Sequence, residues 1–316
     1  MRYELRSYLR MIEDQARYEA YAAALRIAIR PGDVVLDLGA GTGVMSFLAL
    51  EAGAGHVFAV DTNPLVECVR EVAKANALTD RLTILTGDAR QLPLPPVDVI
   101  VHDLRGAMPF YRDGLQVVAD VRSRSLKPSG RLVALRDELH LAPVSAPSAH
   151  VAVSGWQRAH GGADFSSVAR LAASAPFKHY VAPDELLAPG QQIATLDYTK
   201  AGAPALVVRT EARALRAGLL DGLCAWIRCV LTEEVTLSME PGTGATLYGQ
   251  TYFPLLHRQP VAAGDRIEMT LAARSEGEAV LWSWSVALHR EGQPVFRESR
   301  SSLDLLNLES GRPSPR

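Results

Sequence analysis

Two acidic residues stand just after apolar runs that have the length and composition of buried strands. Asp61 follows the run 56–60, and Asp88 stands shortly after the run 82–85. Neighbouring parallel strands end at one edge of a sheet, where a carboxylate can accept hydrogen bonds from both hydroxyls of a ribose. Asp88 taken by itself could equally cap the next turn. The regular spacing of the two acids favours a nucleoside site at that edge.

A glycine-rich turn precedes both acids. Gly39, Gly41 and Gly43 stand at alternate positions between the apolar run 34–38 and the segment 44–54, which has helical composition. The sequence therefore predicts a strand, a tight turn and a helix. Because glycine adopts positive φ and has no Cβ, a ligand can lie against the main chain of this turn.

The spacing of these glycines bears on the identity of the ligand. A dinucleotide-binding turn requires Gly-x-Gly-x-x-Gly, and the third position holds Val44 or Ser46, depending on which glycine is counted first. A nicotinamide enzyme is therefore disfavoured. Gly-x-Gly-x-Gly after the acidic strand residue Asp37 resembles the S-adenosylmethionine loop of class I methyltransferases. That resemblance implies that Asp37 lies near the amino acid end of the cofactor and that Asp88 reaches the adenine amino group.

A second pattern precedes the glycine turn, on one or two amphipathic helices expected between residues 7 and 30. Met11, Asp14, Arg17 and Tyr21 reproduce Met-x-x-Asp-x-x-Arg-x-x-x-Tyr, so the chain resembles the protein arginine methyltransferases, which open with this pattern. The resemblance implies a lid helix and an arginine that clamps the cofactor carboxylate, which suits a bidentate guanidinium. The expected cofactor is S-adenosylmethionine, and its expected contacts are Met11, Arg17, Asp37, Gly39, Gly41, Gly43, Asp61, Asp88 and Ala89.

The segment 102–115 occupies the place of the two-glutamate substrate loop of that family. A guanidinium stays protonated at cellular pH, so two carboxylates are needed to grip it and to localise its charge. Here the first position holds Asp103 and the second holds Arg112, which would repel a guanidinium. Asp113 would replace the second acid if the loop shifted by one residue. Tyr248 stands in the segment that corresponds to the family's Thr-His-Trp, and the histidine is missing here. Tyr248 is expected to line the acceptor pocket.

The chain beyond residue 139 carries proline-rich segments and short alternating runs, which predict a β-rich, barrel-like domain. The insert 154–176 resembles the dimerisation arm of the family through Gly162, Asp164 and Ser166, and it implies a homodimer. The expected fold is α/β, a doubly wound Rossmann-like sheet followed by the barrel-like domain. Its expected parts are lid helices at 1–30, a cofactor domain at 31–139, the barrel-like domain at 140–309 and a tail at 310–316.

Composition narrows the class of protein. The 316 residues carry a net charge of −2, so a general basic field for nucleic acid is absent. Four of the 33 basic residues are lysines, which is typical of a GC-rich bacterial genome. Three cysteines without metal-ligand spacing argue against a disulfide framework and a metal site. No run reaches the length of a membrane span, so a cytoplasmic location is expected.

Several functions are compatible with these features. The departures in the substrate loop favour a methyltransferase whose acceptor is a small molecule or a modified peptide. The first alternative is a true protein arginine N-methyltransferase with a displaced second acid. The second is a non-catalytic, dimeric binding module ordered by the cofactor, which the intact cofactor residues argue against.

Overall fold

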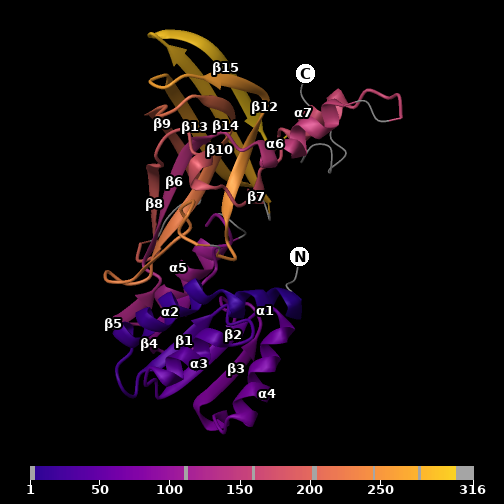
Figure 1. Ribbon diagram of the computed structural model, residues 1–316. Coiled ribbons are helices and arrows are strands. Elements are labelled where there is room, and N and C mark those ends of the chain that lie inside the picture. The colour runs from indigo at the N-terminus through magenta and orange to yellow at the C-terminus, as the bar shows by residue number, and fades with distance from the viewer. Residues whose placement is uncertain are drawn as a thin grey trace.

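The computed structural model describes residues 4–109, 113–158, 161–200, 205–244, 246–276 and 279–303. Two parts are evident, an α/β part that extends to the end of β5 at Val133 and a β-rich part built from the rest of the chain (Figure 1). Among the described residues, no helix is long and apolar enough to cross a membrane.

The α/β part is a five-stranded parallel sheet in the order β3-β2-β1-β4-β5. The expectation of a doubly wound parallel sheet is confirmed. Its inner strands are near-continuous apolar runs, and residues such as Val35, Val57 and Ile100 are fully buried, as expected for a sheet covered on both faces. The strands are β1 Val34–Leu38, β2 His56–Asp61, β3 Leu82–Thr86, β4 Val97–His102 and β5 Leu126–Val133. The helices that follow them are α3 Val44–Glu51, η1 Pro64–Glu67, α4 Cys68–Ala75, η2 Thr79–Arg81 and α5 Gly114–Ser125.

The start of the fifth strand differs from the expectation. The residues Lys-Pro-Ser-Gly at 127–130 predict a turn, with a fifth strand following at 131–135. This prediction is wrong, because β5 already includes Lys127 to Gly130. β5 lies at the edge of the sheet, with a neighbouring strand on one side only. Proline cannot donate a backbone hydrogen bond, and an edge strand tolerates it for that reason. The pairing of β5 with β4 shifts register in this region, which accommodates the irregular segment.

Two helices precede β1, namely α1 Leu5–Glu13 and α2 Gln15–Ala28. They meet at Asp14, whose side chain accepts a hydrogen bond from the Arg17 backbone N–H at 3.1 Å and so caps α2. The other oxygen of Asp14 accepts the backbone N–H of Leu247 at 2.6 Å. This carboxylate therefore ties the helix pair to the β-rich part of the chain.

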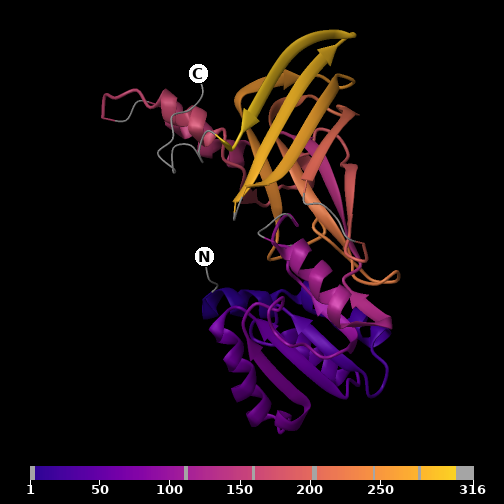
Figure 2. The same ribbon diagram turned by 180° about the vertical axis from the view of Figure 1, so that it is seen from behind.

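The β-rich part consists of two antiparallel sheets with the strand orders β7-β12-β10-β6-β8 and β15-β14-β13-β9. The two sheets curve around a shared apolar core (Figures 1 and 2), which confirms the β-rich expectation. The chain leaves the parallel sheet after β5 and enters the β-rich part at Arg136, a few residues before the expected boundary at 139. The strands are β6 Arg136–Val144, β7 Phe177–His179, β8 Gln191–Asp197, β9 Ala205–Arg213, β10 Gly218–Val230, β11 Thr236–Ser238, β12 Gln250–Val261, β13 Arg266–Glu276, β14 Ala279–Arg290 and β15 Gln293–Ser301.

A helical insert projects from the β-rich part, and both views show it standing away from the rest of the molecule (Figures 1 and 2). It contains α6 Pro147–Ser154, η3 Gly155–Gln157 and α7 Ser166–Ala172. Asp164 accepts hydrogen bonds from the backbone N–H and the hydroxyl of Ser166, at 2.8 Å and 2.6 Å, and so sets the start of α7. The insert overlaps the expected arm at 154–176 but begins earlier, at Pro147. The expected tail at 310–316 lies outside the described residues.

Candidate active site

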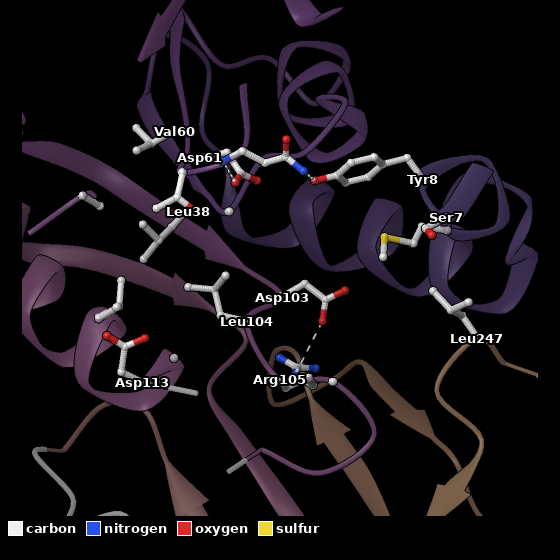
Figure 3. Close-up of a pocket in the computed structure, with 18 of the residues that line it drawn as sticks. Ser7, Tyr8, Leu38, Val60, Asp61, Asp103, Leu104, Arg105, Asp113 and Leu247 are labelled. Carbon is white, nitrogen blue, oxygen red and sulfur yellow. Dashed lines mark hydrogen bonds and ion pairs between the residues drawn. The ribbon is translucent and has the colours of Figure 1, made fainter. Parts of the chain in front are cut away.

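A cavity of about 520 Å³ lies at the carboxyl ends of β1, β2 and β4 (Figure 3). Its roof is formed by α1 and the start of α2, and the segment before β12 closes one side. A crevice at the carboxyl ends of parallel strands is where open α/β sheets bind their ligands, and this volume suits a nucleoside-sized molecule. Most of the expected cofactor residues therefore line the same cavity as the expected acceptor residues Asp103, Asp113 and Tyr248.

The glycine turn and Asp61 form one unit in this cavity. Asp61 Oδ2 accepts the backbone N–H of Gly41 at 2.8 Å, and its Oδ1 accepts that of Asn63 at 2.7 Å. Gly41 has φ +56, and a Cβ built there would lie 2.4 Å from Cε1 of Tyr8. A side chain at this position would therefore displace α1 from the turn. Since a carboxylate has about four lone-pair sites, both oxygens of Asp61 can still accept from ribose hydroxyls.

Replacing Asp61 by alanine is expected to weaken the binding of S-adenosylhomocysteine by about 1.5–3 kcal/mol, or roughly 10- to 100-fold. The loss has two sources, the direct hydrogen bonds to the ligand and the loosened turn at Gly41. Isothermal calorimetry measures it, and Asp80→Ala, at an exposed acid outside the cavity, is the control. An Asp61→Ala variant that binds as tightly as Asp80→Ala would remove Asp61 from the site.

Three of the expected cofactor residues, Asp37, Gly41 and Gly43, do not line the cavity. Asp37 is 2% exposed, and its Oδ2 accepts the Ser46 hydroxyl at 2.7 Å. Burial raises the pKa of Asp37 to about 7, although the Ser46 hydrogen bond opposes the shift. Gly43 begins α3 with φ +87. Asp37 and Gly43 therefore support the conformation of the glycine turn.

The loop after β3 contributes Gly87, Asp88 and Ala89 to the cavity wall. Arg90 binds Asp88 through two nitrogens, with the shortest contact at 2.7 Å, and this pairing lowers the pKa of Asp88. The remaining nitrogen of Arg90 forms an ion pair with Asp113 at 2.7 Å. Arg90 therefore links the expected adenine-binding loop to the start of α5.

The acceptor side of the cavity is organised around Asp103. Its Oδ2 accepts Arg17 Nε at 2.7 Å and also the hydroxyl of Tyr248. Arg17 Nε lies 3.1 Å from the same hydroxyl, and its Nη1 donates to the carbonyl of Met11 at 3.1 Å. The lid helices, the substrate loop and the β-rich part therefore meet at one carboxylate.

One oxygen of Asp103 is left without a hydrogen-bond partner among the described residues. This oxygen, Oδ1, is buried. Burial alone would raise the pKa of this carboxyl, but Arg17 and Arg105 outweigh burial and lower it. Asp103 is therefore a charged acceptor that borders the cavity and can receive a donor group from a bound molecule.

The second expected acid is not beside the first. Asp113 lies across the cavity from Asp103, with Leu104 between them (Figure 3), and its carboxylate is engaged by Arg90. Arg112 lies outside the described residues. Arg90, Tyr8 and Asn63 also line the cavity and were not predicted from the sequence. The Asn63 side-chain amide donates to the Tyr8 hydroxyl at 3.2 Å. The adjacency of Arg90 to Asp88 was a usable signal, whereas the contact between Tyr8 and Asn63 joins distant segments.

The Rossmann-like sheet, the glycine turn with Asp61, and the acceptor carboxylate beside them define a class I methyltransferase. Comparison with protein families agrees. Residues 35–130 match a model described as a methyltransferase domain. Residues 136–285 match an arginine methyltransferase oligomerization subdomain.

Similar proteins extend this result. The chain is 35% identical over 172 residues to probable protein arginine N-methyltransferase 6 of Arabidopsis thaliana, covering 53% of this chain and 39% of that protein. It is 28% identical to probable protein arginine N-methyltransferase 1.2 of the same plant, over 83% of this chain and 75% of that protein. The chain is a protein arginine methyltransferase-like, S-adenosylmethionine-dependent methyltransferase.

Solved structures share the fold. The Trypanosoma brucei PRMT1 enzyme-prozyme complex with AdoHcy superposes with a TM-score of 0.85 at 22% identity, covering 93% of this chain and 97% of that chain. Protein arginine methyltransferase 10 of Arabidopsis thaliana superposes with a TM-score of 0.80 at 20% identity, with the same coverage of both chains. The order of the α/β part, the insert and the β-rich part is therefore that of these proteins.

Proposed function

We propose that this protein transfers a methyl group from S-adenosylmethionine to a side-chain nitrogen of arginine in a protein. The observation that carries the proposal is the buried, charged Asp103, whose Oδ1 is left without a hydrogen bond beside the cofactor cavity. The names of the relatives favour arginine over the small-molecule acceptor that the departures in the substrate loop suggested. The alternative from the sequence is therefore the better-supported function.

The residues of the chain have separable roles in this proposal. The cofactor would supply a methyl group bound to a sulfonium. The acceptor nitrogen would attack that methyl carbon in line, and the sulfur would leave as the thioether. Asp61 holds the ribose, and Arg17 pairs with the cofactor carboxylate while it keeps Asp103 in place. Asp103 Oδ1 accepts a hydrogen bond from the acceptor guanidinium, orients its nitrogen and stabilises the charge. The product guanidinium loses one proton to solvent after the transfer.

A displaced second acid receives less support than the sequence suggested. Asp113 would have to leave Arg90, to which it is bound at 2.7 Å, before it could reach an acceptor. Tyr248 donates its hydroxyl to Asp103, and burial raises its pKa well above the ordinary value, so it acts as a neutral donor. The mechanism we propose therefore uses one carboxylate, supported by Tyr248 and Arg17.

Incubation with methyl-labelled S-adenosylmethionine tests this function. Glycine- and arginine-rich peptides are compared with matched peptides in which every arginine is replaced by lysine. Label is expected in the arginine peptides, and fragmentation by mass spectrometry is expected to place it on the guanidino group. Label that enters only small molecules of a cell extract would contradict the proposal and restore the small-molecule acceptor.

We also propose that the protein is a homodimer held by the helical insert. Trp156 is 41% exposed and lies 6.2 Å, ring centre to ring centre, from the half-buried Phe165 at the projecting end. Val168 and Leu171, on α7 of the insert, are half-buried. The match to an oligomerization subdomain supports the assembly.

Trp156→Glu is expected to weaken the dimer by about 2 kcal/mol or more, because a large aromatic at an interface centre contributes strongly. Light scattering at micromolar concentration measures the change. Val207→Glu, at an 81% exposed residue on β9 outside the insert, is the matched control and is expected to stay dimeric. A wild-type protein that is monomeric under these conditions would refute the dimer.

A further inference from the structure

A second guanidinium is enclosed in the wall of the acceptor pocket. Arg105 lies two residues after Asp103 on the loop that follows β4, and its side chain has no exposed surface. Its Nε lies 3.7 Å from Asp103 Oδ1 and 3.3 Å from Asp137 Oδ2. All three nitrogens of this guanidinium lack a hydrogen bond to the described residues. Figure 3 shows the side chain beside Asp103.

The counter-ion of Arg105 comes from the β-rich part. Asp137 lies on β6 and is completely buried, and its Oδ2 accepts the hydroxyl of Tyr198 at 2.6 Å. The ring of Tyr198 lies 6.0 Å from the Arg105 guanidinium carbon. Burial raises the pKa of Asp137, and Arg105 opposes that shift. Because both parts of the chain hold the pair, the positive charge of Arg105 is fixed in position.

The charges around Asp103 are therefore unusual for a site that binds a cation. Arg17 occupies one oxygen, and Arg105 lies near the other. His102 adds no charge, because burial and Arg105 lower its pKa to about 3. The hydroxyl of Tyr248 is neutral as well. One carboxylate thus faces two fixed guanidinium groups before any substrate enters.

An arginine that binds Asp103 Oδ1 brings a third guanidinium to this group. Asp137 offsets Arg105 from the far side, but Arg105 is nearer to the oxygen that the substrate needs. In a partly buried site like charges a few ångströms apart repel each other more strongly than in water, so Arg105 acts against a second cation at this oxygen. Arg105 therefore weakens the attraction of Asp103 for a cation, whereas it leaves the capacity of Asp103 to accept a hydrogen bond intact.

We propose that Arg105 is a specificity-determining residue, which makes the acceptor pocket select by shape and hydrogen bonding rather than by positive charge. The inference rests on the proposed arginine acceptor. A neutral side chain with the outline of arginine then binds as well as arginine itself. Citrulline has this outline and carries an uncharged ureido group, whose N–H donors can reach Asp103 Oδ1.

Calorimetry with the enzyme saturated in S-adenosylhomocysteine tests the proposal. Two peptides are compared that differ only in arginine or citrulline at the acceptor position. The wild type is expected to bind them with affinities within about threefold of each other. The variant Arg105→Met with Asp137→Asn removes both buried charges together and is expected to raise the preference for arginine by about tenfold or more. Arg105→Lys keeps the charge and is expected to keep the wild-type ratio.

The outcomes separate cleanly. A wild type that prefers arginine by more than about tenfold overturns the proposal, and so does a wild type that binds neither peptide. A double variant that unfolds as the wild type does, binds S-adenosylhomocysteine and shows an unchanged ratio also overturns it. If the double variant does not fold, the wild-type ratio decides. Methyl transfer to the arginine peptide is measured separately, so a peptide that binds but is not methylated counts against the proposed function alone.

Discussion

Replacing Asp103 by asparagine is expected to lower the rate of methyl transfer by about 10²- to 10⁴-fold, the range for losing a positioned charged group. Asparagine keeps an oxygen that can accept from Arg17 and Tyr248, so the local geometry is retained while the negative charge is lost. The binding of S-adenosylhomocysteine is expected to change little. A loss of turnover with retained cofactor affinity is therefore the predicted result, measured by single-turnover assays and by calorimetry.

The matched control is Asp113→Asn, because Asp113 lines the same cavity but is paired with Arg90. Its effect on the rate is expected to stay below about tenfold, since a half-exposed ion pair contributes little. Equal losses in the two variants would show that Asp113 supplies the second acid. An Asp103→Asn variant with wild-type turnover would remove Asp103 from the mechanism.

The α/β part could be predicted from the sequence because its signals are local. Apolar runs that end in glycine or aspartate determine both the strands and the sheet edge at which their ends meet. The expected start of β5 was wrong, since Lys127 to Gly130 has the composition of a turn but lies within the edge strand, between Leu126 and Arg131, which pair with β4. In the β-rich part, β10 is buried along most of its length and has no alternation to detect.

The candidate site likewise combines local contacts, which the sequence indicates, with distant contacts, which it does not. Gly41 and Asp61 are joined by a hydrogen bond across 20 residues within the unit β1-α3-β2, and the sequence predicts that both lie at one edge of the sheet. The partners of Asp103 come from far along the chain, with Tyr248 145 residues away. The periodicity of apolar residues does not predict such contacts, because they depend on how the α/β part and the β-rich part pack together. The role of Arg105 is hidden for the same reason, since its counter-ion lies on β6.

Arg17 offers the sharpest test of how the two halves of the cavity are coupled. Its Nε holds Asp103 and its Nη1 is bound by the Met11 carbonyl, which fixes the plane of the guanidinium at the cavity. Lysine keeps the charge but cannot form this fork, so Arg17→Lys is expected to weaken the binding of S-adenosylhomocysteine by about 10- to 100-fold. Turnover is expected to fall further, because Asp103 loses its partner.

The ligand supplies the discriminating control for this variant. Methylthioadenosine has the adenosine and the sulfur of the cofactor but lacks the carboxylate and the amino group. Arg17→Lys is therefore expected to leave its affinity within about threefold of the wild type, since the lost contact is the charge-assisted pair with the carboxylate. Arg26→Lys, at an arginine whose side chain is 60% exposed, controls for the change of side chain. Equal losses for the two ligands would show that Arg17 supports the fold of the lid, and the carboxylate clamp would then have to be assigned to another residue.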